Sequence, residues 1–430
     1  MGNPRAPRFS IRILSPGSQE PVAVPDIGAR LISMKYVDSE KKADAVTITV
    51  SNRDLRFPDD PIFAHGAVLY VRWGSEGLGP ERICTVQKWT AGYDTFVVEA
   101  HGAGVTLNKN NLTEVWYQKR RSDVARILAK RYGYTEDQMF IDDTQDVYEV
   151  IQPRGKTAAQ LLAAMAARES KNGVPFIFNA NTYGFFFHAR KYEQPSRRLY
   201  EWVGQNAGAL RDFPKFKASI QAKPGAVTVK GVDKTTGKPI EHKADDESTK
   251  GRPGFAPVKM TVNRKTAGVA FMQDVATETV CTTGATTVAD AKKAAGAAFG
   301  KHSGMPLDCT ATVDGDAFLE SKSVVTFERI GRMLSGNYYV KDVAHTIAAG
   351  DYACELTCHR DGTNATGLTG AAAKAMQSSA TQNDTAPTGG GDPGKPPDLV
   401  PRLQLNGRSG GQSWSYVPGT GTSGSPPKQS

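Results

Sequence analysis

Cys354, Cys358 and His359 lie in the segment CELTCHR and are the residues best suited to hold a metal ion. The flanking residues predict a β-strand, in which each residue rises about 3.3 Å, so the two sulfur atoms stand roughly 13 Å apart on one face. His359 points to the opposite face. Because zinc holds its sulfur ligands at about 2.3 Å, one ion cannot bind both cysteines. The segment therefore predicts a strand that buries two cysteines, and we expect no metal site.

Nucleotide binding and nucleophilic catalysis are also not predicted. The segment RGKTAAQ places Gly155, Lys156 and Thr157 before a helix, but a phosphate-binding loop needs its other glycine where the chain has Val150. This half-motif is typical of a helix cap. The seven histidines are spread among turns and strand ends, and no serine carries the flanking glycines of a nucleophile elbow. We expect no catalytic residue and no cofactor.

Two pairs of neighbouring carboxylates are the remaining candidates for chemistry. Asp142 with Asp143, and Asp59 with Asp60, are residue types that cleave glycosidic bonds. Both pairs lie in polar segments predicted to be turns, where aspartate is common because its side chain hydrogen-bonds the backbone. A structural role is favoured for both pairs, with cell-wall cleavage near Asp142 and Asp143 as an alternative.

The cysteine content and the N-terminal residues predict a reduced compartment. The five cysteines are odd in number and widely spread, as is typical of buried thiols, although one long-range pair is compatible with the sequence. They are Cys84, Cys281, Cys309, Cys354 and Cys358. The first residues lack the apolar core of a signal peptide, and no stretch approaches the roughly 20 apolar residues of a membrane span. We expect the chain to be made and folded in a cytoplasm, with no membrane span.

The charge and length indicate a folded chain of several domains. Its formal net charge is +9, but Lys and Arg are scattered along its whole length, which is typical of surface charge and not of an arm that binds nucleic acid. A chain of 430 residues exceeds what one core usually serves, so two or three domains are expected.

Strands and two helices are the elements that position these residues. Residues 8–105 hold six short β-branched and aromatic runs separated by Gly, Pro and Asp, which predicts a small barrel or sandwich domain over 1–105. An α+β insert is predicted over 106–210. Its first helix starts with Ser122 as N-cap, and its second begins with Thr157 and Gln160 in capping-box positions. A hairpin with its turn at 179–184 follows.

The strand pattern returns over 211–362 and predicts a second barrel. It includes the hairpin AVTVKGVDKTTGKPIE and an Ala-rich helix that starts at Thr287. Residues 363–430 form a Gly/Pro-rich extended tail, in which Trp414, Tyr416 and Val417 alternate like a segment that becomes ordered on a partner. The fold class is therefore mainly β (α+β), with two β-barrel domains, an insert between them and a C-terminal tail.

The order of these parts resembles the phage late control protein D family, the baseplate hub proteins of contractile tails, which are related to the N-terminal hub part of VgrG proteins. The resemblance covers roughly residues 8–362. It rests on these segments in order: LISMKYVDSEKKADAVTITVSNRD, FPDDPIFAHGAVLYVRWG, SDVARILAKRYG, TAAQLLAAMAARESKNGVPFIF, AVTVKGVDKTTGKPIE and SGNYYVKDVAHTIAAGDYACELTCHRDG.

In that family, two tube-type barrels per chain and three chains per ring give six barrels in a pseudo-sixfold ring. The resemblance implies a structural, non-enzymatic homotrimer that joins the tail tube ring above to the spike protein below and contacts other baseplate proteins. It also implies a channel for the tape measure protein and for DNA, which passes without sequence-specific binding. The protein would be located in the virion, in the tail baseplate, after synthesis in the bacterial host cytoplasm. The spike and any lytic domain would be separate proteins.

Candidate partner contacts lie at the end of a strand and in the tail. One face of VTITV, residues 46–50, is expected to fill the barrel and the other to line the lumen or a neighbour. Asn52, Arg53 and Asp54 follow that strand and, with Trp414 and Tyr416, are the candidate contact residues. Two alternatives remain: the hub of a phage-derived contractile injection system that delivers protein, and a hub with cell-wall lytic activity.

Overall fold

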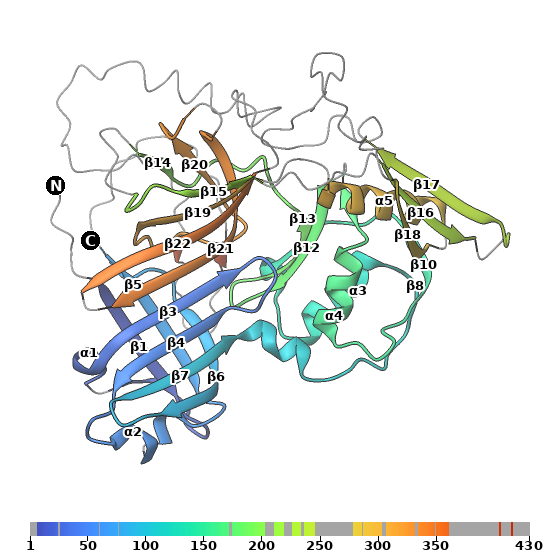
Figure 1. Ribbon diagram of the computed structural model, residues 1–430. Coiled ribbons are helices and arrows are strands. Elements are labelled where there is room, and N and C mark those ends of the chain that lie inside the picture. The colour runs from blue at the N-terminus through green and yellow to red at the C-terminus, as the bar shows by residue number, and fades with distance from the viewer. Residues whose placement is uncertain are drawn as a thin grey trace, which may run out of the picture.

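A computed structural model shows that the fold is mainly β with α+β parts, as the sequence predicts (Figure 1). Within the part of the chain that the structure describes, no helix is both long enough and apolar enough to cross a membrane. The structure describes residues 7–24, 26–59, 61–75, 77–171, 174–202, 210–218, 226–233, 236–245, 278–285, 287–302, 307–331, 334–348, 350–360, 404–405 and 414–415.

The N-terminal part is built from strands that alternate buried and outward-facing side chains. In β4, Val46, Ile48 and Val50 are buried while their neighbours are half-buried, so the predicted alternation of VTITV is confirmed. Four short helices connect the strands: α1 Ile27–Arg30, α2 Arg56–Asp59, η1 Pro61–Phe63 and η2 Ala103–Asn108. The strands are β1 Arg8–Leu14, β2 Val22–Ala23, β3 Leu31–Ser39, β4 Ala45–Ser51, β5 Val68–Gly74, β6 Arg82–Ala91 and β7 Thr95–Gly102.

The C-terminal part continues the same sheet. Its strands are β14 Leu199–Glu201, β15 Lys215–Ala218, β19 Leu307–Asp314, β20 Val324–Glu328, β21 Gly336–Ala348 and β22 Asp351–Arg360. The main path through this 13-stranded sheet runs β15-β19-β22-β21-β3-β4-β7-β6-β5-β1-β2. One apolar core fills its inner side and includes residues of both parts.

The two parts meet where β3 pairs with β21, a contact that we call the seam. Its antiparallel register runs from Asp342 opposite Ser39 to Ala348 opposite Ser33. Because β3 also pairs with β4, and β21 with β22, the seam is an interior contact of the sheet. The two strand-rich regions are therefore joined by backbone hydrogen bonds as well as by packing.

The insert lies beside the seam and has its own core (Figure 1). The predicted capping box of α4 is confirmed, since the Gln160 N–H donates to Thr157 Oγ1 at 3.3 Å. The predicted cap of α3 is wrong: the helix already begins at Arg121, and Ser122 is buried against Thr144. The elements are β8 Trp116–Arg120, α3 Arg121–Arg131, η3 Glu136–Gln138, β9 Met139–Ile141, β10 Val147–Ile151, α4 Ala158–Ala166, β11 Ser170–Lys171, β12 Val174–Ala180 and β13 Phe185–Ala189.

A further unit packs on the insert, away from the large sheet (Figure 1). It consists of β16 Ala226–Val232, β17 Pro239–Asp245, β18 Glu278–Ala285 and the helix α5 Val288–His302. The hairpin β16–β17, which the sequence placed with the second barrel, instead pairs with β18 in a separate sheet. The alternating pattern of a short hairpin predicts which side chains share a face. It does not predict which further strand pairs with the hairpin, and this explains the wrong assignment.

The tail is described at four residues only. β23 Gln404–Leu405 pairs antiparallel with β24 Trp414–Ser415. Trp414 therefore lies in a strand, whereas Tyr416 lies outside the described residues.

Candidate functional site

The predicted contact residues at the end of β4 form a tightly fixed turn. Asn52 is fully buried, and its Nδ2 donates to the carbonyl oxygen of Gly92 at 2.9 Å. Asp54 forms a two-pronged ion pair with Arg30, at 2.8 and 2.6 Å. The hydrogen bond to Arg30 lowers the pKa of Asp54. Arg53 is exposed, 3.6 Å from Asp94. The structure thus brings these three residues together and holds the turn against the β6–β7 hairpin.

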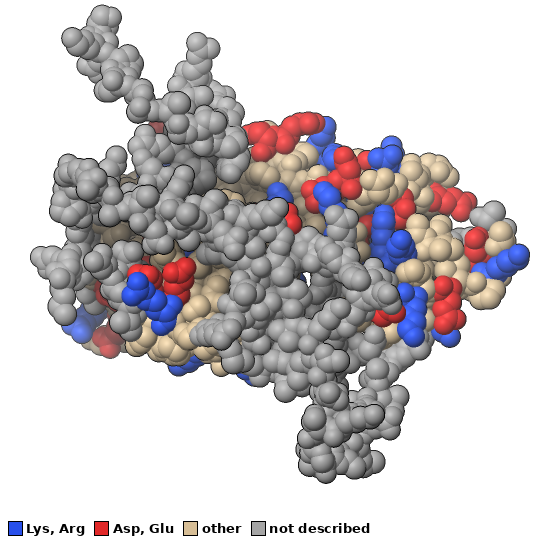
Figure 2. Space-filling model, turned by 90° about the horizontal axis from the view of Figure 1, so that it is seen from above, with Lys and Arg blue, Asp and Glu red and all other residues tan. Residues whose placement is uncertain are grey.

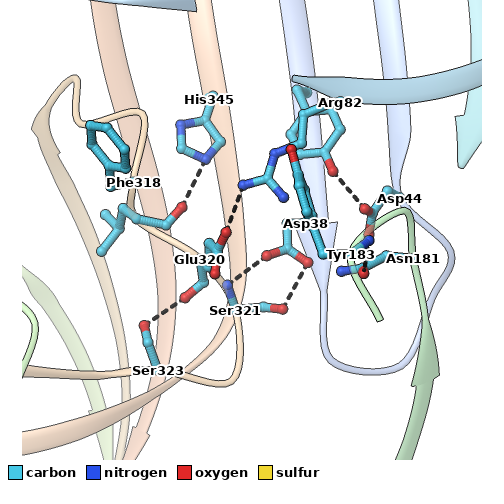
Figure 3. Close-up of polar contacts among 12 residues, drawn as sticks. Asp38, Asp44, Arg82, Asn181, Tyr183, Phe318, Glu320, Ser321, Ser323 and His345 are labelled. Atoms are coloured by element: carbon cyan, nitrogen blue, oxygen red, sulfur yellow. Dashed lines mark hydrogen bonds and ion pairs between the residues drawn. The ribbon is translucent and has the colours of Figure 1, made fainter. Parts of the chain in front are cut away.

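A group of buried charged residues lies where three regions of the chain meet. We call Asp38, Asp44, Arg82, Glu320 and Lys322 the junction cluster, and Figure 3 labels all of them except Lys322. Asp38 is the residue before the last of β3, Asp44 precedes β4, and Arg82 starts β6. Glu320 and Lys322 lie in the loop between β19 and β20. The cluster therefore links both strand-rich regions on the inner side of the seam.

Asp38 anchors the loop of the C-terminal region. Its carboxylate accepts hydrogen bonds from the Ser321 N–H at 2.7 Å and from the Ser321 hydroxyl at 2.8 Å. Burial disfavours the ionised form of Asp38, but the charges of Lys322 and Arg82 outweigh that effect and lower its pKa. Asp38 is therefore an anion that holds the loop through charge-assisted hydrogen bonds.

Arg82 is the central cation of the junction cluster. It is fully buried and donates to Glu320 at 2.8 Å. Its guanidinium also stacks over the ring of Tyr183, which belongs to the β12–β13 turn of the insert, at 4.3 Å from the ring centre. Although burial opposes ionisation of Glu320, Arg82 and Arg197 lower its pKa. One side chain thus joins the N-terminal region, the C-terminal region and the insert.

Asp44 is the exception within this cluster. It accepts a 2.5 Å hydrogen bond from the Tyr36 hydroxyl, while its Oδ1 has no hydrogen-bond partner among the described residues. Burial, together with the charge of Asp38, raises the pKa of Asp44 to about 7. Near neutral pH this carboxyl group therefore exchanges a proton, unlike Asp38 and Glu320.

The insert docks on the same place through its β12–β13 turn. The Asn179 side chain donates to the carbonyl oxygens of Ser39 and Lys42, both at 2.9 Å. The Tyr183 hydroxyl donates to the backbone of Glu81, and the Thr182 hydroxyl donates to that of Ile83 at 3.0 Å. These contacts fix the insert to the β3–β4 turn and to β6.

Aromatic side chains bridge the seam next to the junction cluster. Trp73 of β5 donates its indole N–H to the Tyr352 hydroxyl of β22 at 2.9 Å. Tyr36 lies 4.9 Å from Trp73 and 6.1 Å from His345, measured between ring centres. Burial lowers the pKa of His345 to about 4, so its ring is neutral at physiological pH. Its ring nitrogens meet the Tyr352 hydroxyl and the carbonyl oxygen of Leu319.

The second group of buried charges joins the insert to the helix α5. We call Arg121, Asp146, Glu169, Asp290 and Lys293 the insert cluster. Arg121 donates to Glu169 and to Asp290, each at 2.8 Å. Lys293 lies 2.8 Å from Asp146. Asp290 and Lys293 lie on α5, so ion pairs fasten this helix to α3 and to the residues that follow α4.

The cysteine and histidine candidates lie as the strand geometry predicts. In β22, Cys354 and Cys358 are buried on one face and His359 lies on the other. The sequence missed that Cys354 Sγ lies 3.2 Å from His345 Nδ1, a contact made by the pairing of β21 with β22. Burial raises the pKa of Cys354 to about 12, so the thiol stays protonated and is a weak nucleophile. Cys309 is also a free, buried thiol.

The carboxylate pair of the insert has structural partners. Asp143 lies 2.5 Å from Arg126, which lowers the pKa of Asp143 through that hydrogen bond. Asp142 accepts a hydrogen bond from the Ala189 N–H and lies 3.6 Å from Lys171. A general acid in glycoside cleavage needs a raised pKa, which is the opposite of what Asp143 has. Of the other pair, Asp59 ends α2 and Asp60 lies outside the described residues.

Surface charge is mixed on the face that Figure 2 shows. Basic and acidic side chains alternate over the described part of that face, without a broad field of one sign. This agrees with the scattered positive charge of the sequence.

Comparisons with known proteins identify the fold. No protein-family model matches the sequence, and no curated protein matches it. The 43 kDa tail protein of prophage MuSo2 from Shewanella oneidensis is 13% identical, with a TM-score of 0.55 over 84% of this chain and 100% of that chain. A tail protein from Neisseria meningitidis MC58 is 12% identical, with a TM-score of 0.56 over 83% and 98%. This chain therefore has the fold of tail proteins, and the predicted resemblance is confirmed at the level of the fold.

Proposed function

We propose that this protein is the structural, non-enzymatic hub of a phage tail baseplate. The observation that carries the proposal is the seam, because it joins two strand-rich regions into one sheet in a chain that has the fold of tail proteins. A ring of three such chains presents six similar regions to a sixfold tail tube and three identical chains to a threefold spike. Shape and symmetry, and not a reaction, are then what the protein contributes.

The outward face of the sheet supports a channel in such a ring. Along β4 this face carries Ala45, Thr47, Thr49 and Ser51, which are small and uncharged. In the proposed ring it lines the lumen through which the tape measure protein and then DNA pass, and short uncharged side chains along β4 give the phosphate backbone no charge to bind. Of the charged residues of the two clusters, six are buried and four are half-buried.

Partner contacts are proposed at the turn after β4 and in the tail. Arg53 and Asp54 are exposed in a turn that the buried Asn52 and the ion pair with Arg30 hold in place, so this turn is suited to meet a neighbouring ring or baseplate protein without becoming ordered first. Trp414 and Tyr416 are proposed to anchor the tail on the spike or on a neighbouring chain. We propose the division 1–105, 106–210, 211–362 and 363–430, in which β16, β17, β18 and α5 of the third part form the unit that packs on the insert.

Light scattering together with electron-microscope class averages of the purified chain tests the hub role. We expect the mass of three chains and a ring with an open centre and six lobes. Mixing with the tail tube protein of the same gene cluster should add a second ring on one side only. A chain that forms no ring, alone or with that partner, and that clears peptidoglycan would overturn the proposal in favour of a lytic enzyme.

A further inference from the structure

Eight neighbouring strands of the large sheet form a regular run. It reads β6-β7-β4-β3 on one side of the seam and β21-β22-β19-β15 on the other, with every neighbour antiparallel. Because the number of strands is even, a second copy in the same orientation presents its β6 antiparallel to β15 of the first. The run can therefore repeat from copy to copy without a change in pattern.

The strand β15 is one end of this run. Among the described strands it pairs with β19 alone, and Lys215 and Lys217 are exposed. Phe216 packs partly against the core. Beside it, Trp202 and Phe213 are 38% and 46% exposed and meet edge to face at 5.3 Å. An open strand edge with exposed aromatic rings is a site at which another strand adds.

The strand β6 is the other end, and only its second half is open. β5 pairs with residues 82–85, whereas residues 88–91 pair with β7 alone among the described strands, and Gln87 lies in the bulge between Val86 and Lys88. Residues 87–91 are exposed on both faces of the sheet. Trp89 is 38% exposed and stacks on the buried Phe96, so it stands at the margin of the core. This open segment, residues 88–91, has the same length as the four residues of β15.

We propose that β15 of one copy pairs antiparallel with residues 88–91 of the next copy. This inference rests on the proposed ring and names the contact that closes it. The contact is head to tail, so three identical contacts close a ring. Inside the chain, the seam has Tyr36 on one side and His345 on the other, with their rings in contact. Between copies, Trp89 and Phe216 lie on the core side of the sheet, as Tyr36 and His345 do at the seam. We expect their rings to pack against each other across the contact in the same way.

Charge contributes little to this contact. On the outer face, Lys215 and Lys217 approach Lys88, which is paired with Glu99 at 3.5 Å. The carboxylate there, Glu99, already pairs with Lys88, so Lys215 and Lys217 gain no ion pair of their own. The aromatic side chains and the backbone hydrogen bonds must therefore supply the affinity, and added salt should not weaken the association.

Cross-linking of cysteine variants of the full chain tests the pairing. Thr90 and Lys217 lie on the outer faces of the two edges, because Trp89 and Phe216 next to them face the core. We expect a bismaleimide cross-linker to join T90C with K217C when the two variants are mixed. Neither variant should form dimers alone, because a head-to-tail contact never brings two copies of one residue together. The doubly substituted chain should yield a covalent trimer, and the unsubstituted chain should yield nothing.

A matched pair of substitutions adds an affinity measurement. W89S should raise the dissociation constant of the ring at least about tenfold, as for an aromatic side chain central to an interface. Y93S removes a ring that is 74% exposed at the tip of the same hairpin, beyond the open edge, and should leave it unchanged. Thermal melting of each variant shows that it is folded.

Two results would overturn the edge pairing. One is a mixture that gives no cross-linked product, and the other is a single variant that dimerises with itself. If light scattering still gives three chains in either case, the hub role stands and the ring is closed by another contact. If the chain is instead a monomer that does not cross-link, both the pairing and the ring fail.

Discussion

Two buried groups of charges hold the regions of this molecule together, and they balance charge differently. In the insert cluster, each of the three carboxylates has a cationic nitrogen at 2.8 Å. In the junction cluster, Glu320 has Arg82 at 2.8 Å and Asp38 has Lys322 at 3.4 Å. The third carboxylate, Asp44, has the Tyr36 hydroxyl and no cation within ion-pair distance among the described residues.

This difference shows how buried ions can act either as a fixed fastening or as one that depends on pH. Where every carboxylate meets a cation, ion pairs stabilise the ionised forms, even though burial raises the pKa of Glu169. Where one carboxylate is left over, burial favours its protonated form, and the stability of the contact then follows pH. The four predictions below test this comparison, from the largest expected effect to the smallest.

Substituting Arg82 tests the junction cluster. Arg82→Met removes the closest cation of Glu320 and one of the two cations that lower the pKa of the buried Asp38, and we expect the free energy of unfolding to fall by about 4 kcal/mol, because charges in the cluster lose their compensation. Urea denaturation followed by tryptophan fluorescence measures this loss. Arg197→Met is the matched control: Arg197 also meets Glu320, at 3.5 Å, but is 41% exposed. It should cost less than about 1 kcal/mol. Equal losses would contradict the role of burial.

Substituting Arg121 tests the insert cluster. Arg121→Met should lower the free energy of unfolding by about 3 kcal/mol. The loss is smaller than for Arg82 because Arg121 joins only the insert and α5, whereas Arg82 joins the N-terminal region, the C-terminal region and the insert. Hydrogen exchange should rise in α5 and in the insert before it rises in the large sheet. The control Arg126→Met removes an exposed ion pair with Asp143 and should change stability by less than about 1 kcal/mol. Uniform exchange over the whole chain would argue against a local fastening.

Substituting Asp44 tests whether the junction cluster makes the free energy of unfolding depend on pH. Its pKa in the folded chain, about 7, lies above the ordinary value of 3.8. The stability that it contributes is thus fully present below pH 4 and is lost as the pH rises from 4 to 7. Asp44→Asn should remove this slope and raise the free energy of unfolding at pH 8 by about 2 kcal/mol. Denaturation at pH 5 and pH 8 measures the change. An unchanged slope in the variant would show that another group titrates.

Two tyrosines give the finest comparison. Tyr36→Phe removes the hydrogen bond that Asp44 accepts, and should cost about 2 kcal/mol because a buried carboxyl group loses its donor. Tyr148→Phe removes a 2.9 Å hydrogen bond to Asp290, which keeps Arg121, and should cost about 1 kcal/mol. Thermal unfolding at pH 8 compares the two variants. A larger loss of stability for Tyr148→Phe than for Tyr36→Phe would show that Asp290, and not Asp44, is the poorly compensated carboxylate.

Much of the local structure follows from the sequence. Alternation in residues 46–50 predicts which side chains of β4 are buried, and Thr157 with Gln160 predicts the start of α4. These features depend on neighbours within a few residues. The seam and the partner of the hairpin β16–β17 do not, because any alternating strand edge offers the same backbone groups.

The sequence contains a pattern that indicates two members of the junction cluster. Asp38 follows Met34 and Tyr36 in the buried phase of β3, and Arg82 precedes Cys84 in the buried phase of β6. A charged residue at a position that alternation assigns to the core must find a partner there. That rule marks both residues as members of a buried ion pair. The partners Glu320 and Lys322 could not be named, since they lie in a loop far along the chain.

The seam also determines when the fold can be completed during synthesis. Ser33 of β3 pairs with Ala348 of β21, so the ribosome must add 315 further residues before the partner strand exists. At roughly 5 to 20 residues per second, the edge of β3 waits between about 16 and 63 s without that partner. During this interval the strand can pair with β3 of another nascent chain. Synthesis rate and chaperone supply should therefore limit the yield of folded protein more than its final stability does.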